Sequence, residues 1–137
     1  MSGSEKKIIR TDNAPKAIGP YSVGVQACHF LYTAGQIGLD PKSGTIVTGG
    51  IEMETRQVMN NLKAIVETAG ASMNDVIKTT VFLRDMNDFA KMNAIYGEFF
   101  ADNPPARSTV QVAGLPKGAL VEIELIAMLP KSGCNCS

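Results

Sequence analysis

The sequence has one histidine, His29, and no tryptophan among its 137 residues. One histidine cannot supply a histidine-based metal cluster within a single chain, so we predict no metal site. Beside a predicted strand turn, this histidine is most simply explained as a surface residue. Nucleophile-elbow, phosphate-loop and dinucleotide-binding motifs are also absent, which argues against the enzyme classes that depend on them.

Long apolar runs are missing as well. None reaches the ~18 residues of a membrane span, and the opening MSGSEKKIIRTDNAP has no hydrophobic core of a secretory signal. We therefore expect no membrane contact and a cytoplasmic location, with the mitochondrial matrix as the alternative. Thirteen basic side chains balance thirteen acidic ones, so the overall charge gives no reason to predict a nucleic-acid partner.

Cysteine is scarce, with only Cys28, Cys134 and Cys136. An odd number, two of them crowded into the last four residues, is not a disulfide framework. The terminal pair could chelate a soft metal. Chain ends are usually mobile, however, and free thiols on such a tail are the preferred interpretation.

Hydrophobic periodicity predicts one domain over residues 1–137, with 1–7 and 130–137 flexible. The clearest helix is 51–70, where apolar residues recur at i, i+3, i+4 and i+7 and Gly70 marks the C-terminal end. A second helix is predicted over 87–100, with Asn87 or Asp88 as its N-cap. Strands are predicted at 6–11, twice within 23–38, and at 76–83, 107–113 and 119–129.

This β-β-β-α-β-α-β-β order predicts an α+β fold with two helices on one face of a mixed sheet. Strand 119–129 is long and apolar, so we place it centrally, and we interpret 114–118 as a hairpin connection from strand 107–113. No segment remains to cover the other sheet face. We therefore predict that identical subunits bury it.

Two charged positions stand out on the last two strands. Arg107 opens one strand, and a guanidinium is rarely buried unpaired. Glu122 and Glu124 share one face of the other strand, because side chains alternate. Arg107 and Glu122 form either an internal salt bridge or a site that binds a carboxylate ligand beside a carboxylate base. Glu124 is a candidate structural partner of Lys78 or Arg84.

Two loop positions allow similar alternatives. Tyr21 follows AIGP in a turn-rich loop, and it is either held by packing or closes a small pocket. Gly35, within TAGQIG, would let a ligand approach the backbone amides, although a lone glycine is weak evidence.

Four blocks of the sequence together resemble the RidA (YjgF) family of reactive-intermediate deaminases. They are NAPKAIGPYS, YTAGQIGLDPKSG, VIKTTVFLRDMNDFAKMNAIYGEFF and PPARSTVQVAGLPKGALVEIELIA. The resemblance runs from about residue 8 to residue 129. It implies a chorismate-mutase-like fold assembled as a homotrimer, with active sites in the clefts between neighbouring subunits.

The resemblance also implies a reaction. Members of the family hydrolyse 2-imino acids, the products of PLP-dependent dehydratases, to 2-keto acids and ammonia. We therefore expect a 2-iminobutanoate/2-iminopropanoate deaminase. Water attack on a protonated imine needs placement and a base, so no metal or organic cofactor is expected.

Residue roles follow by resemblance. Arg107 would bind the substrate carboxylate, and Glu122 would orient a water and accept its proton. Substrate-binding roles are implied for Tyr21, Gly35, Phe89, Asn93 and Thr109. Thr109 departs from the family, because many members carry cysteine there. The alternatives are a small-molecule or protein-binding module without turnover, and an RNA-directed translation inhibitor.

Overall fold

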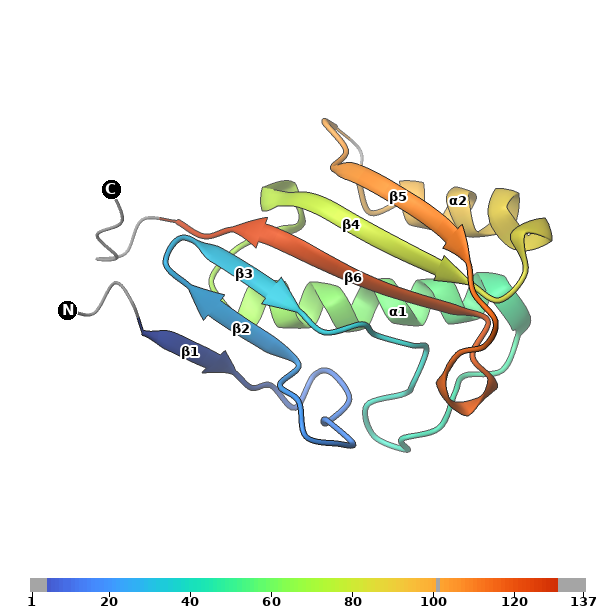
Figure 1. The fold of residues 1–137 in the computed structure, drawn as a ribbon, viewed down its shortest axis with the longest axis horizontal. Helices are drawn as coiled ribbons and strands as arrows, with labels where there is room; N and C mark the ends of the chain where they lie inside the picture. Colours follow the sequence, from blue (N-terminus) through green and yellow to red (C-terminus); the bar gives the residue numbers. More distant parts are fainter. Residues whose placement is uncertain (1–4, 101, 131–137) are drawn as a thin grey trace.

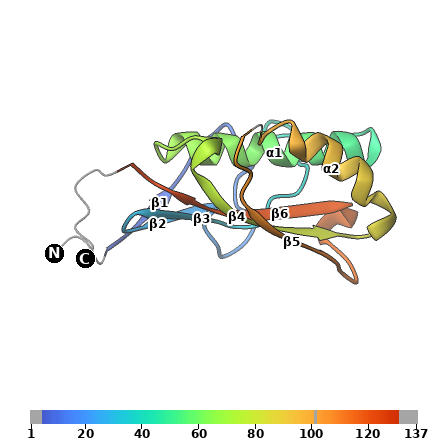
Figure 2. The same ribbon diagram turned by 90° about the horizontal axis from the view of Figure 1, so that it is seen from above.

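The computed structural model describes residues 5–100 and 102–130. It confirms the α+β class and the predicted order of elements, with two α-helices and six strands joined in one mixed sheet (Figure 1). The strands are β1 (Lys6–Ile9), β2 (Gly24–Ala27), β3 (Phe30–Thr33), β4 (Val76–Leu83), β5 (Ala106–Gln111) and β6 (Val121–Met128), and the helices are α1 (Gly50–Thr68) and α2 (Phe89–Gly97). Both helices cover the same face of the sheet (Figure 2). Within the described ranges, neither helix is long and apolar enough to cross a membrane.

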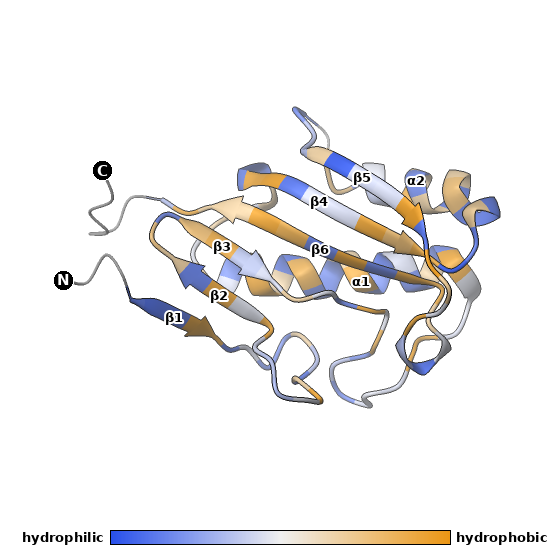
Figure 3. Ribbon diagram, viewed as in Figure 1, coloured by the Kyte–Doolittle hydropathy of each residue, from blue (hydrophilic) through white to orange (hydrophobic). Residues whose placement is uncertain are grey.

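Strand β6 is central, as predicted, because the sheet order is β1-β2-β3-β6-β4-β5. Its odd-numbered residues are buried and its even-numbered residues are less so. Hydrophobic and hydrophilic colours alternate over the first half of the strand in Figure 3. The buried set packs under α1, whose apolar stripe is fully buried: Val58, Met59, Leu62, Ile65 and Val66. One sheet face is therefore core, and Glu122 and Glu124 lie on the other face.

The predicted hairpin between the last two strands is wrong. β5 runs parallel to β4 at the sheet edge, and β4 lies between β5 and β6. The connection instead passes over the end of β4, where the Val112 amide donates to Leu83 O (2.9 Å) and the Arg84 amide donates to Leu120 O (3.0 Å). Residues 114–118 are of the types found in hairpin turns. The residues on either side of them lengthen the loop enough to cross the end of β4.

Both helix ends reflect local chemistry. Gly70 follows α1 with φ of 94°, a left-handed conformation that favours glycine, which confirms the predicted stop. α2 begins directly after Asp88, as predicted, but the Asp88 side chain makes no capping bond. Asp85 accepts from the Asn87 amide at 2.9 Å instead, because a 3₁₀ turn precedes the helix and moves the capped amide one turn earlier.

The sheet face opposite the helices exposes large apolar side chains to solvent. Tyr32, Val110 and Met128 are all exposed, and they come from three different strands. This is the surface for which the sequence predicts a cover of identical subunits. Apolar area of this kind on a single chain is typical of a contact surface.

Some sequence predictions concern the chain ends. Lys6 and Lys7 fall in the stretch predicted to be flexible, yet they pair with Ala27 and Gln26 of β2. Cys28 is disulfide-bonded, a bond that the cysteine count did not indicate. The Cys134 and Cys136 tail lies outside the described residues.

Candidate functional site

Arg107 lies on the helix-covered face of the sheet. It is the second residue of β5, beside the buried Thr79 of β4, so its side chain points toward α2. Its Nη1 donates to Asn93 Oδ1 at 2.7 Å. The guanidinium also stacks on two rings of α2, with its Cζ 4.9 Å from the Tyr96 centroid and 5.4 Å from the Phe89 centroid. These contacts fix the plane of the guanidinium.

Tyr96 joins this group, although the sequence analysis did not single it out. Its hydroxyl is hydrogen-bonded to Thr79 Oγ1 at 2.7 Å, and both residues are buried. Burial raises the pKa of Tyr96, so the phenol stays neutral beneath the arginine. Its position one helical turn after Asn93 was the available signal, because residues three apart share a helix face.

Thr109 follows two residues after Arg107 and shares its face of β5. The Thr109 Oγ1 atom is buried and has no hydrogen-bond partner among the described residues. The structure therefore gathers four predicted site residues, together with Tyr96, into what we call the Arg107 cluster: Phe89, Asn93, Tyr96, Arg107 and Thr109.

A second group forms on the opposite face of the sheet. A cavity of about 60 Å³ is bordered by Tyr21, Gly35 and Glu122, all predicted site residues. We call it the Glu122 cavity. The Tyr21 hydroxyl accepts from the Ile18 amide at 3.2 Å, which holds the ring across the loop. The sequence prediction missed the other lining residues, which include Lys16, Gln36 and Pro116.

Gly35 matters for a reason the sequence did not indicate. A Cβ at this position would overlap Glu122 Oε2 and stand 2.7 Å from its Cδ. The carboxylate therefore lies directly on the Gly35 backbone, in space that any side chain would fill. The neighbouring Gln36 fixes the register, because it exchanges two backbone hydrogen bonds with Ile123 at 2.8 and 3.1 Å.

The Glu122 carboxyl is electrostatically perturbed. Burial raises its pKa, and the nearby Glu124 carboxylate raises it further. No ion pair between Glu124 and Lys78 or Arg84 forms in the described structure. Lys78 Nζ donates to Ser108 Oγ at 3.2 Å, and Arg84 Nη1 lies 3.5 Å from Gly118 O. A raised pKa makes Glu122 a stronger base than an ordinary surface glutamate.

Of the two alternatives for Arg107 and Glu122, the internal salt bridge does not form. Within the described ranges the one ion pair joins Arg56 to Glu98, at 2.8 Å. Arg107 faces α2, whereas Glu122 faces the open side of the sheet. The two groups therefore lie on opposite faces of one sheet.

Comparison with known proteins identifies the family. The family described as Endoribonuclease L-PSP matches residues 11–129. A RutC family protein of Pyrococcus horikoshii is 60% identical over 122 residues, covering 89% of this chain and 97% of that protein. The 2-iminobutanoate/2-iminopropanoate deaminase of Mus musculus is 51% identical over 128 residues, covering 93% of this chain and 95% of that protein. The chain belongs to the RidA (YjgF) family.

Solved structures agree with this membership. The crystal structure of Escherichia coli TdcF with bound serine has a TM-score of 0.87 and 46% sequence identity, over 90% of this chain and 99% of that one. The resemblance noted in the sequence is thereby confirmed. Among the described residues of this RidA family member, no group of three His, Cys, Asp or Glu side chains could hold a metal ion.

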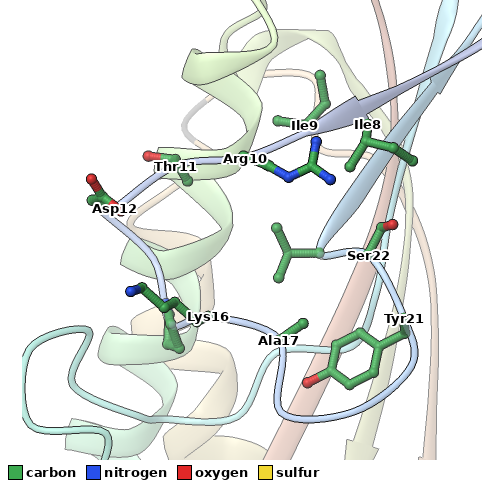
Figure 4. Close-up of a pocket in the computed structure, with 11 residues that line it drawn as sticks. Ile8, Ile9, Arg10, Thr11, Asp12, Lys16, Ala17, Tyr21 and Ser22 are labelled. Carbon is green, nitrogen blue, oxygen red and sulfur yellow. The ribbon is translucent and has the colours of Figure 1, made fainter.

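A larger cavity of about 290 Å³ adjoins the Glu122 cavity, and Figure 4 shows the residues that line it. Arg10 and Ser22 border it, and Lys16 and Tyr21 border both cavities. The Tyr21 loop therefore contributes to the lining of both cavities.

Proposed function

We propose that this RidA family member hydrolyses 2-iminobutanoate and 2-iminopropanoate to the corresponding 2-keto acids and ammonia. Relatives about half identical over most of their length are named for this reaction. The related TdcF structure holds serine, which has the carboxylate and nitrogen of a small imino acid. The same chemistry requires a cation for the carboxylate and a base for water.

The proposed active unit is a homotrimer. The Arg107 cluster of one subunit would meet the Glu122 cavity of the next, because the two lie on opposite faces of one sheet. Burial of the exposed Tyr32, Val110 and Met128 against neighbouring copies would supply the driving force.

Arg107 is the proposed carboxylate-binding group. Its guanidinium is held flat by Asn93 and two aromatic rings, and it has no carboxylate partner among the described residues. This preorganised, unneutralised cation is the observation that carries the proposal. A planar fork matches a carboxylate in two parallel hydrogen bonds and thereby fixes the C2 atom next to it.

Glu122 is the proposed base. It takes a proton from a water whose oxygen adds to C2 of the protonated imine, giving a tetrahedral carbinolamine. The proton then returns to nitrogen, the C–N bond breaks and ammonia leaves, while Glu122 takes the hydroxyl proton as the C2–O bond becomes the 2-keto double bond. That proton passes to ammonia, which departs as ammonium. Backbone groups of Gly35 and Thr109 are proposed to hydrogen-bond the substrate, and Tyr21 to close the pocket.

The test couples a threonine dehydratase to this protein and follows decay of the imine. We expect 2-ketobutanoate to appear faster than in buffer. Arg107→Ala should lower kcat/KM by about 10- to 150-fold, the value of a charge-assisted contact of roughly 1.5–3 kcal/mol. Glu122→Gln should lower kcat while carboxylate binding persists, and Arg56→Ala, an exposed arginine on α1, serves as the control. Equal turnover by wild type and Glu122→Gln would contradict the proposed base.

An RNA-directed activity is the second candidate, because the matching family is described as an endoribonuclease. Net charge of zero weighs against it. Filter binding to single-stranded RNA at several salt concentrations separates the two functions. Tight binding with a steep salt dependence would favour RNA over an imino acid.

A further inference from the structure

A buried carboxylate lies on α1, close to the Glu122 cavity. Glu54 has 6% of its surface exposed, although it belongs to a helix with one face in solvent. Its Oε1 accepts from the Leu120 amide at 2.9 Å. A glutamate is almost never buried to this extent without a hydrogen-bond partner, and the Leu120 amide is that partner.

Asn61 lies two turns further along α1, on the same face as Glu54. It is 1% exposed, and its Nδ2 donates to Ile37 O at 3.3 Å and to Leu39 O at 3.0 Å. Gln57 Nε2 donates to Asn61 Oδ1 at 2.8 Å, which orients that amide. One face of α1 therefore binds two chain segments through side chains.

Both segments contribute residues to the lining of the Glu122 cavity. Gly35, Gln36, Ile37 and Leu39 come from one segment, and Pro116 and Glu122 come from the other. Leu120 stands two residues before Glu122, at the entry to β6. Gly38 packs on Glu54 itself, where an added Cβ would lie 3.0 Å from Glu54 Cα. Glu54 thus contacts both chain segments that line the Glu122 cavity, through the Leu120 amide and through Gly38.

We propose that Glu54 is a positioning residue, which fixes the entry to β6 through the Leu120 amide and so holds the Glu122 carboxylate against Gly35. The loop before Leu120 needs such an anchor, because Lys117 and Gly118 both adopt left-handed conformations, with φ of 56° and 69°. The expected effect of Glu54 on turnover rests on the proposed imine hydrolysis. Its effect on the position of Glu122 does not depend on that proposal.

The experiment compares three changes in the full chain. Glu54→Asp shortens the side chain by one methylene, which moves the acceptor oxygen away from the Leu120 amide and keeps the charge. Glu54→Gln keeps an acceptor oxygen and removes the charge. Glu52→Asp makes the same change as the first variant at an exposed position of α1. Hydrogen exchange of the Leu120 amide and an NMR titration of the Glu122 carboxyl are measured without substrate, and kcat and KM are measured with it.

We expect Glu54→Asp to speed exchange of the Leu120 amide by about tenfold or more and to lower kcat by a similar factor, with KM changed less than about twofold. The pKa of Glu122 should fall toward its ordinary value as water reaches it. Glu54→Gln and Glu52→Asp should match wild type within about twofold.

Two results would overturn the proposal. In the first, Glu54→Asp lowers the melting temperature but leaves Leu120 exchange and the Glu122 titration unchanged. In the second, Glu54→Gln is as impaired as Glu54→Asp, so that the acceptor oxygen is not what matters. If wild type itself shows no imine hydrolysis, the proposed function fails, and the two substrate-free measurements still decide the role of Glu54.

Discussion

Glu122 and Arg107 are prepared for their proposed roles by different neighbours. Glu122 rests on the bare backbone of Gly35, with its pKa raised by burial and by Glu124. Arg107 is held by Asn93 and by two rings. Each charged group is thus held in position by contacts with uncharged residues. Precise placement of this kind contributes to catalysis through orientation.

Gly35→Ala should therefore displace the Glu122 carboxylate. We expect kcat in the coupled imine assay to fall by about tenfold or more, with KM little changed because Arg107 is untouched. Gly114→Ala is the control, since a Cβ at Gly114 meets nothing within 4 Å. Full activity in Gly35→Ala would mean that Glu122 does not need this position.

Glu122→Gln should raise the melting temperature at neutral pH while lowering activity. Because the folded-state pKa of Glu122 is raised, its ionisation costs stability above that raised value and costs nothing below the ordinary pKa of about 4.3. The advantage of Glu122→Gln should therefore shrink as the pH falls through this window. Thermal melts of both proteins from neutral to acidic pH measure it, and a gap that widens on acidification would contradict the assigned shift.

At the scale of elements, the Arg107 cluster depends on the contact between β4 and α2. The hydrogen bond between Thr79 and Tyr96 crosses this contact in a buried environment. It anchors the ring on which Arg107 stacks. The Glu122 cavity depends in the same way on α1, through Glu54 and Asn61. Each helix thus supports one half of the proposed site.

A double-mutant cycle tests the β4–α2 anchor. Thr79→Val and Tyr96→Phe should each lower the free energy of unfolding by about 1–3 kcal/mol, because each removes one partner of a buried hydrogen bond. The double variant should lose less than the sum of the two. Chemical denaturation gives the three values, and strict additivity would show that the hydrogen bond contributes no coupling.

At the scale of the whole molecule, the sheet separates the two halves of the site. The Arg107 cluster lies under α2, and the Glu122 cavity lies on the other face. The proposed homotrimer would bring them together across subunit boundaries. Assembly would then be a condition for activity as well as a cover for apolar surface.

Subunit mixing tests this arrangement directly. Arg107→Ala and Glu122→Gln proteins are unfolded together, refolded in equal amounts and assayed. If each site takes its arginine from one subunit and its glutamate from the next, about a quarter of the sites regain both groups. Activity near a quarter of wild type is expected. Mixtures no more active than the separate variants would show that the two groups do not meet between copies.

The sequence alone determined the order of elements, the central place of the last strand and the shared face of Glu122 and Glu124, because these follow from local periodicity and from the length and apolarity of each segment. Seven site residues were predicted by family resemblance. The tertiary structure decided how those residues divide between the two faces of the sheet. The pairing of β5 with β4 turns Arg107 toward α2, and this depends on contacts between distant segments that no local pattern encodes. Glu54 and Tyr96 were missed for the same reason, since a polar residue in a helix gains its role only from what the fold brings against it.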